Sequence, residues 1–391
     1  MSEPHAPKAP QVWKLLEGWA RRRPREAALA ALLAVVVVGA AVFSASPSGA
    51  RYLRVAFASG TIAPLPAAPR RAAREQAGAL AAQLDARLDK KNKFGGDAWT
   101  SAQILLALRE NDPGYAGKVG VRQIDNFFRQ IAGPECACWR RLPQGQYPNN
   151  VGVTGWVLWA LGAYGIPATK GEIEHLLATQ NKEGWWPMFS DSKSPRSASS
   201  YATAVAALAL QSQAGVKAYQ GERERLLKSA QRGAEWLKAH AVPGKTRWKD
   251  YPAWPDAAKQ GEFLGLSGFV LFALHRVGAP ALVEFDRDWL RGLPDDVPSA
   301  QASDSAPKPV PIGKRSTPDD THHFALPWAI AATVLAYPSG SLPQRARAMR
   351  WIERALAPGA SLYAVSGAKD TELAAELLFA LRDYPEAIRG N

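Results

Sequence analysis

The segment Gln180–Gln213, QNKEGWWPMFSDSKSPRSASSYATAVAALALQSQ, carries the signals of two helices joined by a structured turn. Gly184 can reverse the chain, because glycine accepts a positive φ at little cost. Trp185 and Trp186 follow, and rings of this size suit the space between two helices, where the indole N–H finds an acceptor. After serines that can cap a helix, Tyr201–Leu210 is apolar and mostly small, which predicts a helix that is buried on every side.

Six segments of this apolar type occur along the chain. They are Ala98–Leu108, Val151–Tyr164, Tyr201–Leu210, Phe263–Leu274, Phe324–Ala336 and Leu373–Leu381. Each follows a more charged, amphipathic segment: Arg70–Lys90, Val119–Ile131, Lys170–Gln180, Glu222–His240, Ala281–Arg291 and Leu342–Leu356. Helix pairs that repeat every ~50 to 60 residues predict a solenoid or a closed ring. Closure is favoured, because an open stack would leave one apolar face of the inner layer in water.

Gln180–Gly184, the Trp185-Trp186 pair and the Tyr201–Leu210 helix resemble the repeat of squalene–hopene cyclases and of the protein prenyltransferase β subunit. The resemblance implies an all-α fold, an (α/α)6 toroid of six helix pairs, over roughly residues 70 to 385. The same toroid occurs in thioester-containing complement-type domains and in many glycan-active enzymes, so the fold alone does not choose an activity.

The sequence lacks the chemical signatures of these families. A class II cyclase uses Asp-x-Asp-Asp, whereas this chain has only the pairs Asp295-Asp296 and Asp319-Asp320. The Asp-x-Cys of a prenyltransferase zinc site and the Cys-x-Glu-Gln of a thioester are also absent. The resemblance therefore supports the scaffold and weakens the best-known activities of its members.

The N-terminal region predicts a membrane anchor. Residues 1–26 form a basic tail, residues 27–50 carry no charge, and the 17 apolar residues Ala27–Phe43 with their Ser/Ala flank suffice for one transmembrane helix. The preceding arginine cluster predicts a cytoplasmic N-terminus, and a cleaved signal peptide is the alternative. Residues 51–69 then form a Pro/Ala linker, and residues 70–391 form a toroid domain on the periplasmic side.

The connections from outer to inner helices are long, whereas those from inner to outer helices are short. In a ring of helix pairs the long connections share one face, which we expect to be the working mouth. The mouth-facing turns carry polar residues that include Glu372, and each of these also suits a helix N-cap or the helix dipole. The net charge of +13 favours an acidic glycan, a lipid-linked polymer or anionic head groups as partner, and no nucleic-acid motif accompanies it.

The best candidate catalytic residues are two histidines with nearby acids. Asp320, His322 and His323 fall within five residues, and Glu262 and Asp97 are the candidate carboxylate partners near the starts of two other inner helices. Histidine suits proton transfer near neutral pH. Adjacent histidines on a helix point about 100° apart, so a shared metal ion is not expected. Helix capping and packing remain the alternative for this group.

Candidate binding residues are the aromatic and amide side chains of the long connections: Trp139, Asn150, Trp185, Trp186, Tyr201 and Trp254. Exposed indole faces stack on sugars and on isoprenoid chains alike, and the alternative for each ring is the core. Cys136 and Cys138 are the only cysteines, and a local disulfide and free thiols are both open. The sequence identifies no cofactor.

Three hypotheses for the function follow. The leading one is a membrane-anchored envelope protein whose toroid binds or processes a glycan or a lipid-linked envelope polymer. The second is a non-catalytic toroid that holds a partner protein of the envelope. The third is a terpenoid cyclase or prenyltransferase-like enzyme. A deep cavity with converging acids and histidines would favour an enzyme, a plugged cavity would favour a binding module, and a deep aromatic cavity would favour isoprenoid chemistry.

Overall fold

The computed structural model describes residues 67–87, 98–115, 117, 120–132, 139, 150–190, 194–253, 262–300, 302–305, 322–357 and 371–382. The chain divides into two compact units, residues 1–63 and residues 64–391, and the described residues all belong to the second unit. The predicted tail, anchor and most of the linker lie outside the described residues and stay predictions. No helix among the described residues has both the length and the apolarity to cross a membrane.

The described residues form twelve α-helices of two kinds that alternate along the chain. The apolar helices are α5 (Ala98–Asn111), α8 (Val151–Ala163), α10 (Ser200–Ala214), α12 (Leu264–Arg276), α14 (Ala325–Ala336) and α17 (Thr371–Arg382). The charged helices are α4 (Ala67–Arg87), α7 (Val121–Ile131), α9 (Lys170–Thr179), α11 (Arg223–Ala239), α13 (Val283–Arg291) and α15 (Leu342–Ala355). The predicted six helix pairs are confirmed, and we number them repeats 1 to 6 in chain order.

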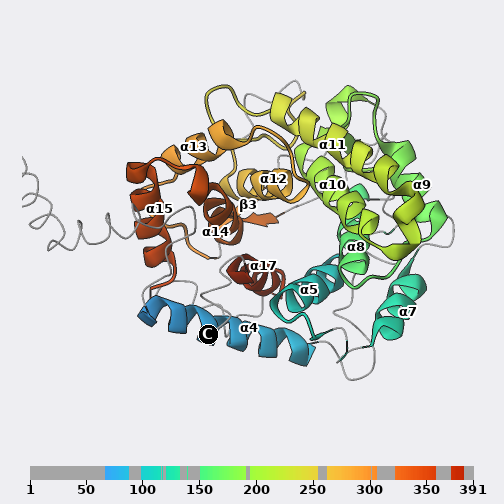
Figure 1. Cartoon of the computed structure of the whole chain (residues 1–391), viewed down its shortest axis with the longest axis horizontal. Coiled ribbons are helices and arrows are strands. Elements are labelled where there is room, and N and C mark those ends of the chain that lie inside the picture. Colours follow the sequence, from blue (N-terminus) through green and yellow to red (C-terminus); the bar gives the residue numbers. More distant parts are fainter. Residues whose placement is uncertain are drawn as a thin grey trace, which may run out of the picture. The chain divides into compact units, whose positions relative to one another are not determined.

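The apolar helices form a closed inner ring. Each contacts the next one in chain order, and α17 contacts α5, so that repeat 6 meets repeat 1. Figure 1 shows these helices side by side around a common axis, with the charged helices outside them. The predicted toroid of inner and outer helices is therefore present in this unit.

Neighbouring inner helices run parallel, and small residues let them approach closely. A Cβ on Gly155 of α8 would lie 2.9 Å from Val205 of α10, and one on Gly162 would meet Ser212 farther along the same two helices. A Cβ on Gly268 of α12 would lie 2.5 Å from the Trp328 carbonyl oxygen of α14. Because the inner helices start at the same end of the ring, the connections that lead into them also arrive at that end.

The turn that organises repeat 3 folds as the sequence predicts. Gly184 adopts a φ of 108°, and a Cβ there would collide with the Arg232 carbonyl oxygen, so both conformation and space require glycine. Ser199 caps α10, because its hydroxyl accepts a hydrogen bond of 3.0 Å from the Ala202 N–H.

The all-α prediction needs one correction, because two connections form short antiparallel ladders. β1 (Trp186–Pro187) pairs with β2 (Ala198–Ser199), and β3 (Ser303–Ser305) pairs with β4 (His322–Phe324). β2 and β4 each end where an inner helix starts. The ladders satisfy backbone groups of the long connections before those helices begin.

Candidate functional site

Aromatic side chains occupy the axis of the inner ring, and every inner helix contributes at least one. They are Trp99, Trp156, Trp159, Tyr201, Phe269, Phe272, Trp328 and Phe379, and none is more than 7% exposed. The ring centroids of Trp156 and Trp328 lie 6.4 Å apart, although α8 and α14 stand opposite each other in the ring. Trp159 reaches Phe379 of α17 at 5.4 Å. Aromatic packing therefore spans the axis at the second and third turns of these helices.

We call these eight axial residues the aromatic floor. A polar cluster lies next to them, toward the end of the ring where the inner helices begin. Glu372 and Glu376 are one turn apart on α17. Thr100 of α5 donates a 3.2 Å hydrogen bond to Glu372, and the Gln103 amide donates a 3.1 Å bond to Glu376. Glu376 is only 5% exposed, whereas Glu372 is half-buried. The contact that closes the ring thus places two carboxylates together near its axis. We call Thr100, Gln103, Tyr201, Glu372 and Glu376 the axial cluster.

Tyr201 links the axial cluster to the aromatic floor. Its ring stacks on Trp99 at 5.7 Å, and its phenol oxygen accepts a hydrogen bond from the Trp156 indole. Burial raises the pKa of the Tyr201 phenol well above its ordinary value, and the negative charges of Glu376, Glu372 and Asp250 raise it further. The phenol therefore stays protonated and can donate its hydrogen to an acceptor.

Buried polar atoms without a partner among the described residues include the indole N–H of Trp328 and the side-chain oxygen of Gln103, in residues 1% and 3% exposed. A buried polar group without a partner is costly. One atom donates and the other accepts, which are the two roles of a hydroxyl group or a water molecule.

Trp139, Trp186 and Trp248 form a repeated structural contact, which we call the tryptophan clasp. In each clasp the indole N–H donates to a carbonyl of the preceding outer helix, at Phe128, Leu176 and Leu237 respectively. The tryptophan backbone N–H donates to a hydroxyl of the following inner helix, at Thr154, Thr203 and Ser267. The three indoles are fully buried and join the two helices of repeats 2, 3 and 4.

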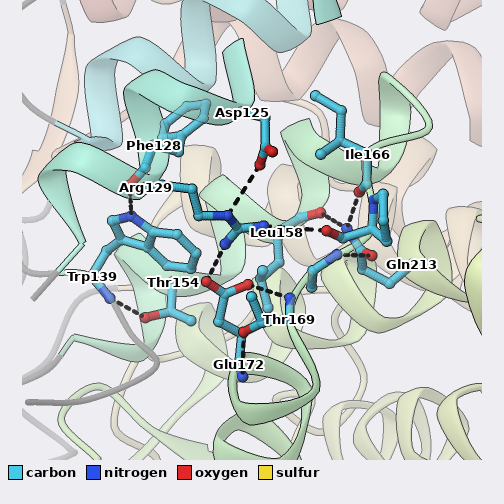
Figure 2. Close-up of polar contacts among 12 residues, drawn as sticks. Asp125, Phe128, Arg129, Trp139, Thr154, Leu158, Ile166, Thr169, Glu172 and Gln213 are labelled. Atoms are coloured by element: carbon cyan, nitrogen blue, oxygen red, sulfur yellow. Dashed lines mark hydrogen bonds and ion pairs between the residues drawn. The ribbon is translucent and has the colours of Figure 1, made fainter. Parts of the chain in front are cut away.

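Figure 2 shows the clasp of repeat 2 beside a buried ion pair. Arg129 of α7 bonds Asp125 and the carboxylate of Glu172 on α9, and Glu172 also accepts from the Thr169 N–H. Glu172 is only 3% exposed, and its capping box and its guanidinium partner satisfy it. This buried carboxylate has a structural use.

The predicted binding residues lie in different environments in the structure. Tyr201 lies at the axis, as the mouth hypothesis expects. Trp139 and Trp186 are clasp residues without an exposed face, and Trp185 is 2% exposed. Asn150 caps α8 through a 3.1 Å bond from the Val153 N–H. Trp254 lies outside the described residues.

Of the predicted catalytic side chains only Glu262 is described, so the convergence of the group stays a prediction. Glu262 forms a 3.1 Å ion pair with Lys245 and lines a surface cleft away from the axial aromatic rings. His322 and His323 lie in strand β4, directly before α14, and not in a helical turn. Their backbones pair with Ser305 and Asp304 of β3. Asp97 and Asp320 lie outside the described residues. No group of side chains suited to a metal ion occurs among the described residues.

Sequence reasoning placed Glu372 at the mouth but missed Thr100, Gln103 and Glu376. The signal for Glu376 was available, because it is the single charge within the apolar run LAAELLFAL. Such a residue in a helix buried on all sides needs a partner or a use, since glutamate is almost never fully buried alone.

No protein-family model matches the chain, and no curated protein sequence matches it. Among solved structures, it is similar to an inactive variant of an α-1,6-mannanase from Salegentibacter in complex with α-1,6-mannotetrose. That match has 13% identity and a TM-score of 0.50, and covers 81% of this chain and 99% of the mannanase. A type II terpene cyclase from Scytonema in complex with geranylgeranyl dihydroxybenzoate matches at 14% identity, a TM-score of 0.46 and coverages of 82% and 99%.

The likeness to the mannanase supports the helical toroid and goes no further than the fold. A specific family within the toroids is not identified, so the resemblance to squalene–hopene cyclases remains one of architecture.

Proposed function

We propose that the toroid binds and processes a glycan at the end of the ring where the inner helices begin, with Glu372 and Glu376 as its acid–base residues. The observation that carries this proposal is the axial cluster above an aromatic floor. Sugar rings offer apolar faces for stacking and hydroxyl groups for polar side chains. Aromatic side chains beside a few convergent polar groups fit that chemistry.

The two carboxylates suit acid–base work on a glycosidic bond. Residues four apart on a helix have Cβ atoms about 5–6 Å from each other, so both acids can reach one sugar linkage. Glu376, the more buried of the two, would serve as the general acid toward the leaving oxygen. Glu372, which is half-buried, would act as the base or nucleophile. The protonated Tyr201 phenol would donate a hydrogen bond to a sugar oxygen.

The predicted N-terminal anchor gives this proposal a cellular setting. Residues 27–50 would hold the toroid on the periplasmic side of a membrane, where envelope polymers are within reach. The glycan would then be an envelope polymer, free or lipid-linked.

A second candidate is a non-catalytic toroid that holds an envelope partner. The contact across the axis between Trp156 and Trp328 favours it, because rings that touch at 6.4 Å leave no deep channel at that level. The same packing weighs against the isoprenoid hypothesis, which needs an aromatic-lined cavity wide enough for a long chain.

The test uses the full chain in detergent with a panel of neutral, amino and acidic oligosaccharides, peptidoglycan fragments and a polyprenyl phosphate. Thermal shifts report binding, and mass spectrometry reports products. We expect one glycan class to stabilise the protein and to be cleaved. Glu376→Gln should lower the cleavage rate by about 10²- to 10⁴-fold, since it removes a general acid while keeping the side-chain shape.

Glu284→Gln is the matched control, because this glutamate lies on outer helix α13 with a side chain 75% exposed. It should leave both binding and cleavage unchanged. Glycan binding without any product would support the non-catalytic toroid. Stabilisation by the polyprenyl phosphate alone, or cleavage that both Glu372→Gln and Glu376→Gln retain, would overturn the assignment of the axial cluster.

A further inference from the structure

A second cleft lies outside the inner ring, where the connection from α11 to α12 passes the C-terminal end of α13. Its volume is about 440 Å³, within the range of small-ligand sites. Besides two glycines, it is lined by Lys245, Thr246, Arg247, Glu262, Asp288 and Arg291. No axial aromatic residue and no member of the axial cluster lines it, so it is independent of the proposed glycan site.

The walls of this cleft are fixed by contacts between the connection and α13 with the residue that follows it. The Thr246 hydroxyl donates a 2.6 Å hydrogen bond to the Phe285 carbonyl of α13. The Arg247 guanidinium donates a 2.6 Å bond to the Gly292 carbonyl and lies 4.8 Å from the centre of the Trp289 ring. The next residue, Trp248, is the clasp of repeat 4. The cleft is therefore preformed and does not depend on a ligand for its shape.

The four charged groups of the cleft other than Arg247 form ion pairs that are, in contrast, easily exchanged. Lys245 and Glu262 pair at 3.1 Å with side chains 61% and 31% exposed. Arg291 and Asp288 pair at 2.9 Å with side chains 69% and 26% exposed. Exposed ion pairs of this kind contribute little to stability, and a ligand can replace either partner at low cost.

The mixture of charges decides the ligand class. A simple anion would meet Lys245, Arg247 and Arg291, but it would also meet two carboxylates, and a simple cation faces the reverse conflict. A ligand with one ammonium and one carboxylate group complements both signs and replaces the ion pairs without leaving an unpaired charge.

We propose that this cleft binds a short zwitterionic ligand, such as an amino acid or a short peptide. Its ammonium group binds between Glu262 and Asp288, and its carboxylate binds Lys245 and Arg291. The Arg291 guanidinium offers the carboxylate a two-pronged donor. This assignment gives Glu262 and the basic connection at Lys245 and Arg247 a binding role that is separate from catalysis.

Isothermal titration of the full chain tests the proposal with glycine, 4-aminobutanoate, 6-aminohexanoate and triglycine, which place the two charges at increasing separations. We expect one of these compounds to bind best. Its N-acetylated form and its C-terminal amide should each bind at least about tenfold more weakly, because each loses one charge-assisted contact. Inorganic phosphate, a simple anion, should also bind more weakly than the best compound.

Variants locate the binding. Glu262→Gln and Arg291→Gln should each weaken the best compound by about tenfold or more. Glu284→Gln on α13 and Arg225→Gln on α11 are matched controls, because both residues pair on the outer surface beyond the cleft. These controls should bind normally.

Three results would overturn the proposal. They are equal binding of the blocked and free compounds, tighter binding of phosphate than of every zwitterion, and no binding by any of the four compounds. The blocked compounds give this answer on the wild-type protein, so it does not depend on whether a variant folds. Because the readout is binding at this cleft, failure here leaves the proposed glycan site untouched, and the reverse also holds.

Discussion

Repeats 2, 3 and 4 join their outer and inner helices differently from repeat 5. In the first three, a tryptophan within the connection donates to both helices, as Trp186 does to Leu176 and Thr203. In repeat 5 the tryptophan is part of the outer helix itself. Trp289 of α13 donates directly to Thr333 of α14 at 3.0 Å, and the long connection between these helices contains no tryptophan. A repeat can therefore hold its two helices together without using its connection, which leaves that connection free to vary.

The largest expected effect comes from breaking a clasp completely. Trp186→Ala should lower the free energy of unfolding by about 3–5 kcal/mol, because a fully buried indole is replaced by a cavity between two helices. Urea denaturation followed by circular dichroism measures this loss. A loss below about 1 kcal/mol would mean that the clasp is dispensable and that helix packing alone holds repeat 3.

Two threonine variants test the difference between repeats 3 and 5, and their expected loss of stability is intermediate. Thr203→Val leaves the backbone N–H of Trp186 without its acceptor, and Thr333→Val does the same to the indole N–H of Trp289. Each should cost about 1–3 kcal/mol, the usual penalty for an unsatisfied buried donor.

Hydrogen exchange separates these two variants. Thr203→Val should speed amide exchange in the connection of repeat 3, because that connection loses an anchor. Thr333→Val should leave exchange in residues 292–300 unchanged, since only the two helices share its bond. Equal effects on both connections would show that the two repeats do not differ in the way described.

The smallest expected effect is a pH dependence in repeat 3. Burial lowers the pKa of His175 on α9 below its ordinary value of 6.5, so the folded state favours the neutral ring. The unfolded chain then takes up the proton first, and stability is present above about pH 6.5 and is lost as the pH falls.

The carbonyl of the adjacent residue, Leu176, accepts the clasp bond of Trp186. Protonation of His175 therefore occurs beside the clasp of repeat 3. Urea denaturation between about pH 7.5 and pH 5.5 should show falling stability in the wild type and a flatter profile in His175→Gln. An unchanged slope in the variant would assign the pH dependence to other groups.

The architecture was largely predictable from sequence, because a helix that is buried on every side requires a long run of apolar residues. The runs at Val151–Tyr164 and Tyr201–Leu210 became α8 and α10 with ends shifted by a few residues. The residues of the axial cluster were less predictable, because helix-capping side chains and axis-facing side chains are of the same types. Asn150 caps a helix, whereas Tyr201, two residues after the corresponding cap Ser199, turns to the axis.

The position of a residue along the chain also does not show whether its side chain points toward the ring axis or outward. Glu262 lies two residues before an inner helix, yet it pairs outward with Lys245 because the preceding connection folds back along α13. Glu376 lies in the middle of an inner helix and approaches the axis. The partner of each depends on residues distant in sequence, which a pattern within one helix cannot reveal.

Closure of the ring also has a consequence for how the protein is made. Thr100 and Glu372 are separated by 272 positions in the chain, and Gln103 and Glu376 by 273. During synthesis on the ribosome, the first inner helix therefore has one bare apolar flank until α17 has emerged. A chain that ends before α17 lacks both carboxylates and the helix that covers this flank. Premature termination would then yield a product whose apolar flank is open to chaperones and proteases, so a chain without the closing helix is recognised as unfolded.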